Sequence, residues 1–232
     1  PENLTRRLGR LLSALQHQIS ADAIVNACNT ASTCVLPRLR AQLAVPVVGT
    51  VPAIRPAAAL SQTGMISVLA TPATASSPYL QSLIEEFAFG KEVQIVAATT
   101  RATLAEQRFR GGAGDSEALA REIRPAFIKA GGWRTDTIVL GCTHYPLLLE
   151  DLKAVAPWPV SWLDPAKAVA SQLMRVLYPS CLIGGPHPLP GRLTFQWTSG
   201  VKPPEVQAQM RERCLGPVLS SPDGHLITGV CA

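Results

Sequence analysis

The chain has 232 residues, of which 47% are hydrophobic and only 5% aromatic, so it can bury a sizeable core of small aliphatic side chains in one large or two small domains. Its formal net charge of +5 is spread along the sequence, which argues against nucleic acid binding and suits small anionic ligands. The sequence shows no apolar run of membrane-spanning length and no signal-peptide core, so we expect a cytoplasmic protein without membrane contact whose six cysteines are reduced.

The first part of the chain alternates helices and short strands. Leucines at spacings of three and four predict an amphipathic helix over residues 3–18. Apolar runs and the segments between them then predict a strand at 24–28, a helix at 30–43, a strand at 45–51 and a helix at 52–60. Gln62-Thr63-Gly64 precedes a new apolar run, and we place a domain junction there.

The following residues repeat the same alternation. The predicted elements are strand 65–70, helix 75–87, strand 92–97, helix 101–109, helix 115–130 and strand 136–141. Helices at 146–155 and 165–178, separated by residues 160–163, then precede strand 193–197 and helix 204–214. Such alternation predicts an α/β fold with mostly parallel sheets. We expect a first domain formed by residues 1–61 with 164–215, a second domain at 62–163, and a tail of unknown role at 216–232.

Two distant segments share one pattern, in which an Asp opens an apolar run containing Ile-Val and a Cys stands where the run ends. They run from Asp22 to Thr30 and from Asp136 to Pro146. Each places a cysteine, Cys28 or Cys142, at the carboxyl end of a predicted strand, where ligands of open α/β sheets bind. A thiol at the start of a helix also lies near free N–H groups, which favour the thiolate. The repeated pattern predicts two reactive half-sites.

The residues around both cysteines resemble the paired motifs of the glutamate racemases, within the aspartate/glutamate racemase superfamily. The resemblance rests on Ala27-Cys28-Asn29-Thr30-Ala31-Ser32 and Leu140-Gly141-Cys142-Thr143-His144-Tyr145-Pro146-Leu147, and it continues through residues 46–54, 68–74 and 77–79. It implies two pseudosymmetric α/β domains with the active site at their interface. It also implies a strand, a helix and a second strand before Pro1, so we expect a chain that is incomplete at its N-terminus.

The resemblance also implies roles for individual residues. Cys28 and Cys142 would be the two bases that exchange the Cα proton of glutamate, with His144 managing the proton beside Cys142. The implied substrate-binding residues are Asn29, Thr30, Thr71, Thr74, Thr143 and Glu106. The implied reaction interconverts L-glutamate and D-glutamate without a cofactor or metal, and it would supply D-glutamate for bacterial peptidoglycan.

The residues alone leave other interpretations open. Cys142 and His144 could be metal ligands or a nucleophilic pair, although zinc needs more clustered ligands and a hydrolase gives no reason for a second matched cysteine. Thr74 could cap the following helix, and Glu106 could be a solvated helix residue. The alternatives to glutamate racemisation are a racemase for aspartate or a hydantoin and an inactive relative that binds a ligand or partner. The oligomeric state is open, with a homodimer as one option.

Overall fold

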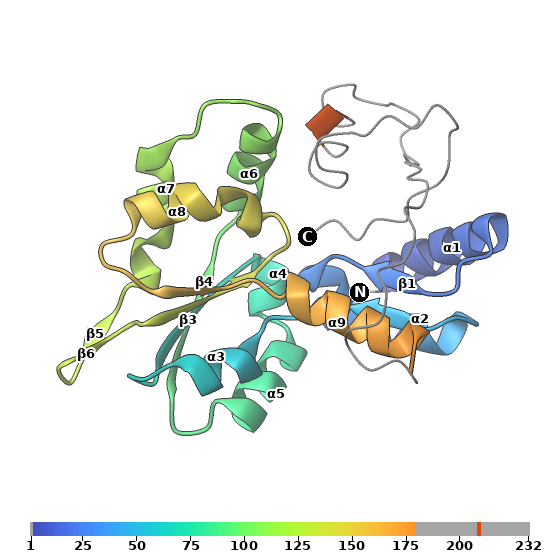
Figure 1. The fold of residues 1–232 in the computed structure, drawn as a ribbon, viewed down its shortest axis with the longest axis horizontal. Helices are drawn as coiled ribbons and strands as arrows, with labels where there is room; N and C mark the ends of the chain where they lie inside the picture. Colours follow the sequence, from blue (N-terminus) through green and yellow to red (C-terminus); the bar gives the residue numbers. More distant parts are fainter. Residues whose placement is uncertain (1, 180–207, 210–232) are drawn as a thin grey trace.

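The structure, a computed structural model, describes residues 2–179 and 208–209. These residues form a four-stranded sheet, a two-stranded sheet and a small hairpin, with helices between the strands (Figure 1). The first two sheets are parallel throughout. The predicted class, α/β with mostly parallel sheets, is therefore confirmed.

The four-stranded sheet positions one of the two cysteines. Its order is β4-β3-β7-β8, with β3 (Met65–Ala70), β4 (Glu92–Ala97), β7 (Thr137–Gly141) and β8 (Ser161–Leu163). Every residue of β3 and β7 is buried, as expected for central strands of a sheet that is covered on both faces. The register pairs Ala70 with both Ala97 and Gly141, so three strands end at the same edge. That edge is the carboxyl end of the sheet.

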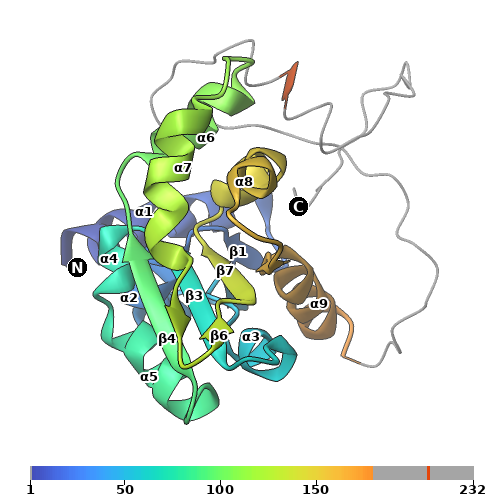
Figure 2. The same cartoon turned by 90° about the vertical axis from the view of Figure 1, so that its left-hand side faces the viewer.

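Helices cover both faces of this sheet (Figure 2). One face carries α6 (Arg101–Phe109), α7 (Ser116–Ile123) and α8 (Leu149–Val155), and the other carries α3 (Ile54–Leu60) and α5 (Pro78–Phe87). Leu69 and Leu140 pack in the first of these cores. Val68 and Val139 pack in the second. Neighbouring residues of one strand thus serve opposite cores, because side chains alternate across a strand.

The two-stranded sheet carries the other cysteine. It consists of β1 (Ile24–Asn26) and β2 (Val47–Gly49), which are joined by α2 (Asn29–Gln42). The predicted helix at 3–18 is confirmed as α1 (Glu2–Ile19), which packs Leu4, Leu8 and Leu12 against the apolar face of α2. α2 keeps Pro37 in its interior.

The helix predicted over 75–87 is wrong at its start. A separate turn, α4 (Pro72–Ala75), comes first, and α5 begins only at Pro78. Ser77 caps α5, because its Oγ accepts a hydrogen bond from Leu80 N at 3.2 Å. A residue before proline also disfavours the helical conformation, which separates the two helices. The interpretation of Thr74 as the cap of this helix is therefore wrong.

The helix predicted over 115–130 is too long. α7 ends at Ile123, a 3₁₀ turn, η1 (Arg124–Ala126), follows, and β5 (Lys129–Ala130) and β6 (Trp133–Arg134) then form an antiparallel hairpin. Gly131 and Gly132 make its turn with φ angles of +56° and +83°. Glycine adopts such angles without steric cost, and a Gly-Gly pair is a hairpin signal. In the sequence, the apolar spacing of the preceding helix is the stronger signal, so the predicted helix extends over the hairpin.

Other boundaries differ by a few residues. β1 ends at Asn26, before Cys28, and a 3₁₀ turn, η2 (Tyr145–Leu148), precedes α8. The predicted strand at 193–197 and the tail at 216–232 lie outside the described residues, and within the predicted helix at 204–214 only residues 208 and 209 are described, both as helix. None of the described helices has the length and apolarity needed to cross a membrane.

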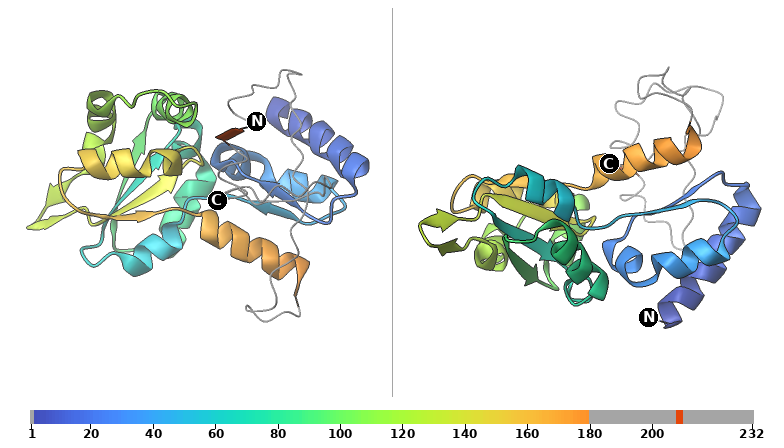
Figure 3. Two further views of the ribbon diagram at one scale, coloured as in Figure 1. Left: turned by 45° about the horizontal axis from the view of Figure 1, so that its top comes forward. Right: turned by 90° about the horizontal axis from the view of Figure 1, so that it is seen from below.

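The division into two domains remains a proposal. The sequence assigns residues 54–60 to the first domain, whereas α3 packs Ile54 and Ala57 in a core of the four-stranded sheet. After β8, α9 (Ala166–Leu177) returns to lie against β2 (Figure 3). We therefore propose that the chain passes from the smaller to the larger sheet just before α3 and comes back at α9.

Candidate active site

Cys28 lies in the turn between β1 and α2. Its backbone is extended, with φ −150° and ψ 116°, and its Sγ accepts a hydrogen bond from Ala31 N at 3.5 Å, so the sulfur caps α2. The residue is exposed. Ser32 Oγ accepts hydrogen bonds from Thr50 N at 3.0 Å and Asn26 Nδ2 at 3.2 Å. These bonds fix the ends of both strands beside the cysteine.

Cys142 directly follows β7, where three strands end together. The preceding Gly141 lies so close to the neighbouring strand that a Cβ atom there would be 2.7 Å from Leu69 O. No side chain fits this approach without a shift of the backbone. Cys142 consequently sits tightly against the sheet edge and is only 8% exposed. The two cysteines thus occupy similar places in the fold and differ in burial.

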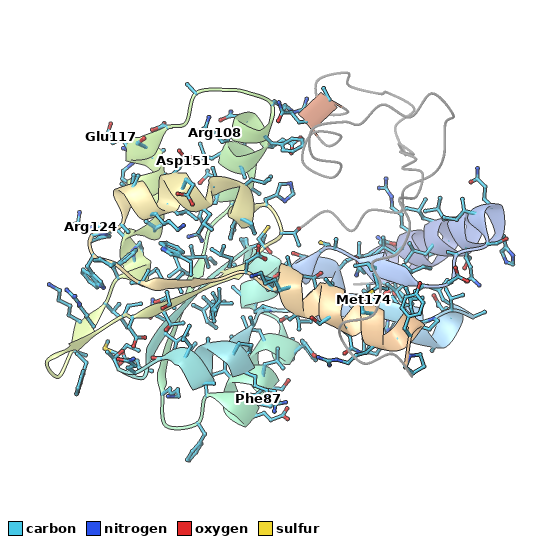
Figure 4. All side chains as sticks on the ribbon, viewed as in Figure 1. Phe87, Arg108, Glu117, Arg124, Asp151 and Met174 are labelled. Carbon is cyan, nitrogen blue, oxygen red and sulfur yellow. The ribbon has the colours of Figure 1, made fainter. Side chains whose placement is uncertain are left out.

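His144 and Glu106 extend from Cys142 toward solvent. Cys142 Sγ lies 3.8 Å from His144 Nδ1, and His144 Nε2 lies 3.8 Å from Glu106 Oε2. Glu106 belongs to α6, which is tied to α8 by an ion pair between Arg108 Nε and Asp151 Oδ2 at 3.1 Å (Figure 4). The structure therefore brings three predicted site residues into one row. It places Glu106 beside His144, and a direct contact of Glu106 with substrate stays a prediction.

Burial raises the pKa of the Cys142 thiol above its ordinary value. The backbone N–H of His144 opposes this rise, negative charge on Cys28 adds to it, and the positive charge of Arg101 opposes it. The net direction is upward. Cys142 therefore holds its proton at neutral pH in the absence of a ligand.

Three threonine hydroxyls meet where the two sheets approach each other. Thr30 Oγ1, in the first turn of α2, lies 2.8 Å from Thr71 Oγ1 and 3.1 Å from Thr74 Oγ1. Thr71 Oγ1 donates to Thr74 Oγ1 at 3.1 Å and so closes a ring of hydroxyls. Thr71 is the N-cap of α4 directly after β3. This ring links the segment that carries Cys28 to the carboxyl edge of the larger sheet.

A second link joins the two cysteine turns directly. Thr143 Oγ1 donates a hydrogen bond to Ala27 O at 3.2 Å. Thr143 follows Cys142 in the sequence, and Ala27 precedes Cys28. The structure therefore brings together the two segments that share the Asp-to-Cys pattern.

Asn29 is the most unusual polar residue of this region. It is 2% exposed, and neither its Nδ2 nor its Oδ1 has a hydrogen-bond partner among the described residues. A buried polar group without a partner costs roughly 1–3 kcal/mol. An amide offers donors and an acceptor together, so it can bind a ligand that carries both a carboxylate and an ammonium group.

A surface hollow of about 600 Å³ lies elsewhere, at the β5–β6 hairpin, where Thr63 and residues 129–134 line it. The hairpin precedes β7, whereas Cys142 follows it, so the hollow is at the opposite end of the strand. No predicted site residue lines it. We take the carboxyl edge as the candidate active site, because the nucleophilic and titratable side chains converge there.

Sequence reasoning missed Arg101 of α6. Its side chain is fully buried, and its charge acts on Cys142. Arginine is mostly exposed in proteins, and the sequence around Arg101 gives no sign that this side chain is buried. Only the packing of α6 against the turn after Cys142 reveals it.

A family profile described as Asp/Glu/Hydantoin racemase matches residues 3–173. The chain belongs to this family. Its curated relatives include the glutamate racemase of Brucella ovis, 46% identical over 177 residues that make up 76% of this chain and 64% of the relative. The glutamate racemase of Brucella anthropi is also 46% identical, over 77% of this chain and 63% of the relative. The chain thus spans slightly less than two thirds of the length of these racemases.

Solved racemase structures share the fold. Escherichia coli glutamate racemase, in complex with L-glutamate and the activator UDP-MurNAc-Ala, matches with a TM-score of 0.71 and 37% identity over 76% of this chain and 65% of that chain. Glutamate racemase from Bacillus anthracis matches with a TM-score of 0.62 and 29% identity, again over 76% of this chain and 65% of that chain. Membership of the racemase family therefore rests on sequence and fold together.

Proposed function

We propose that this chain interconverts L-glutamate and D-glutamate through two cysteine bases, Cys28 and Cys142, without a cofactor. The observation that carries the proposal is the hydrogen bond between Thr143 and Ala27, which joins the turns of two cysteines at the strand ends of different sheets. Relatives that are named glutamate racemases support the choice of substrate. The same proposal places the reaction in the cytoplasm, with D-glutamate passing to peptidoglycan synthesis.

Inversion at Cα needs one group to remove a proton and another to return one from the opposite face. In one direction the Cys28 thiolate takes the Cα proton and the Cys142 thiol donates its own, and the reverse direction exchanges these roles. Each turnover leaves the two sulfurs with their protonation states exchanged, so a proton must move before the next turnover. The row formed by Cys142, His144 and Glu106 can return that proton through the half-exposed imidazole.

The substrate's charged groups would meet the polar residues between the cysteines. Asn29 offers a buried amide without protein partners. Thr30, Thr71, Thr74 and Thr143 place hydroxyls on both sides of the junction between the sheets. Preorganised donors to the carboxylate stabilise the carbanionic transition state, which a thiolate alone is too weak a base to reach.

The test is proton NMR of Cα–H exchange and inversion in D₂O, with L-glutamate and D-glutamate as separate substrates. We expect both enantiomers to exchange with inversion, and we expect Cys28→Ala and Cys142→Ala each to abolish inversion. Cys34→Ala is the matched control, because Cys34 packs beside the core of the smaller sheet outside the candidate site. This control should retain the parent rate.

Other outcomes would redirect the proposal. Inversion that survives in either cysteine variant contradicts the two-base reaction. A folded chain that inverts aspartate or a hydantoin faster than glutamate contradicts the substrate, since the family description covers all three. A folded chain that exchanges none of them contradicts the activity and points to a binding role.

A further inference from the structure

Arg101 is a cation in a place that disfavours cations. It is the first residue of α6, where the helix dipole is positive, and its side chain is 0% exposed. Burying a charge is costly unless it is paired, and a positive charge at a helix N-terminus adds to the cost. Local structure therefore gives no reason for arginine at this position, and the reason must lie in its neighbours.

The partners of Arg101 hold it in place and neutralise its charge only in part. Its Nη2 donates to Val96 O at 2.7 Å, and its Nη1 donates to Glu122 O at 3.3 Å. Both acceptors are uncharged carbonyl groups. The one carboxylate that faces it, Glu122 Oε2, lies 3.9 Å from Nε, and Nε makes no hydrogen bond among the described residues. Glu122 Oε2 is itself buried and makes no hydrogen bond among the described residues, so at 3.9 Å it neutralises Arg101 only in part.

Arg101 contacts the turn that carries Cys142. Its guanidinium carbon lies 5.2 Å from the centre of the fully buried Tyr145 ring, within cation–π distance. Tyr145 N donates to Cys142 O at 3.1 Å, so the same residue closes the turn around the cysteine. Arg101 is thus connected to Cys142 through one side chain and one hydrogen bond.

The charged groups around Cys142 come from several elements. His144 shares its turn and has Glu106 of α6 behind it, and Cys28 faces it from the start of α2. Burial and the Cys28 charge raise the pKa of Cys142, whereas the His144 backbone N–H and Arg101 lower it. Among the described groups that influence Cys142, Arg101 alone carries a full positive charge, because an imidazole is charged only when protonated.

We propose that Arg101 is a positioning residue for Cys142, whose buried charge and contact with the Tyr145 ring prepare this side of the site to hold a thiolate. The inference rests on the proposed two-cysteine reaction, in which Cys142 must lose and regain a proton. Glu122 has the opposite influence, because its carboxylate partly cancels the charge of Arg101. The pair therefore sets how readily Cys142 ionises.

The test is a thiol titration of the full chain with Cys142 as its only cysteine. The ultraviolet absorbance of the thiolate is measured as the pH is raised. The other five cysteines are replaced by serine: Cys28, Cys34, Cys181, Cys214 and Cys231. We expect Arg101→Met to raise the pKa of Cys142 and Glu122→Gln to lower it. Arg101→Lys, which keeps the charge, should stay near the parent. Both uncharged variants remove the same ion pair, so structural damage alone cannot produce opposite shifts.

A second readout uses the native cysteines. We expect Arg101→Met to slow glutamate inversion on the order of tenfold at neutral pH and to recover part of the loss in alkaline solution, with Arg101→Lys rescuing it. If Arg101→Met does not fold, Arg101→Lys and Glu122→Gln still decide the question. Unchanged thiol titrations, or shifts of the same sign in Arg101→Met and Glu122→Gln, would overturn the inference. A parent chain without inversion would sink the proposed function, while the titration would still report on Arg101.

Discussion

The two cysteine turns begin from one sequence pattern and end in different surroundings. Cys28 is exposed, caps a helix and follows a strand of three residues in a two-stranded sheet. Cys142 is buried, follows a fully buried central strand and has a histidine and a buried arginine nearby. The pattern thus predicts where each sulfur lies, whereas packing by distant segments determines how deeply it is buried. Two cysteines that we propose to perform matched steps need not be matched in environment.

Of the changes that test this comparison, removal of the His144 imidazole should have the largest effect. Among the described residues, only the Cys142 turn has such a group beside its cysteine. His144→Asn should lower the rate of glutamate inversion on the order of 100-fold, because the proton on Cys142 loses its relay. L-glutamate and D-glutamate have equal free energy, so kcat/KM must fall by the same factor in both directions. Steady-state kinetics with each enantiomer measures this.

The matched control for that change is His17→Asn, since His17 is exposed on α1. It should retain the parent rate. If His144→Asn inverts glutamate within roughly twofold of the parent rate, Cys142 exchanges its proton without the imidazole. The two cysteines would then act more alike than their surroundings suggest.

Gly141→Ala breaks the close strand contact that seats Cys142. Its Cβ would lie 2.7 Å from Leu69 O, so the strands must separate, and we expect a loss of about 1–3 kcal/mol in the free energy of unfolding. Urea denaturation measures it. Gly114→Ala is the control, because its Cβ would be 3.8 Å from the nearest atom, Asp151 Oδ1. Equal losses in both variants would contradict the packing explanation.

The aspartates that open the two patterns also differ. Asp22 is exposed, whereas Asp136 accepts hydrogen bonds from the Ser61 hydroxyl at 2.7 Å and from the backbone N–H groups of residues 62 and 63 at 2.7 and 2.8 Å. Burial alone would raise the pKa of Asp136, but these bonds and one from Thr137 outweigh it and hold the pKa below its ordinary value.

The smallest predicted effect follows from this difference. A lowered folded-state pKa means that the ionised Asp136 stabilises the fold fully above its unfolded pKa, and that this contribution is lost as pH falls through the folded pKa. Asp136→Asn should cost about 1.5 kcal/mol at neutral pH, with the gap to the parent closing in acid. Asp22→Asn should cost nothing measurable. Denaturation across pH checks both, and a gap that persists in acid would contradict the assignment.

The sequence predicted the bounds of two strands of the larger sheet, β3 and β4. For β3, an apolar run between Gly64 and Thr71 leaves little freedom of assignment. The hairpin at 129–134 was not predicted. The helical spacing of apolar residues just before it suggested that the helix continued past Ile123. The break at Ser77 follows from a serine cap and a proline, two local signals that the apolar pattern masked.

The candidate site also has features that the sequence predicts and features that it does not. The places of Cys28 and Cys142 at the ends of strands were predictable, because they follow from position in the chain. The resemblance placed His144 beside Cys142, but the contact between His144 and Glu106 and the burial of Arg101 were not predictable, because both arise where α6 packs against the turn after β7. Side-chain burial and pairing across elements are tertiary properties, which the pattern of residues along the chain does not predict.

The ring of Thr30, Thr71 and Thr74 has a consequence for the polarity that it presents. Three hydroxyls possess three O–H donors, and three contacts within the ring use all of them. Thr74 is fully buried, so the ring can present only the oxygen lone pairs of Thr30 and Thr71 outward, an arrangement that suits an ammonium group. To receive a carboxylate, one internal contact must open and its O–H must rotate away. The two partly exposed hydroxyls can thus face either end of an amino acid, at the cost of a single hydroxyl rotation.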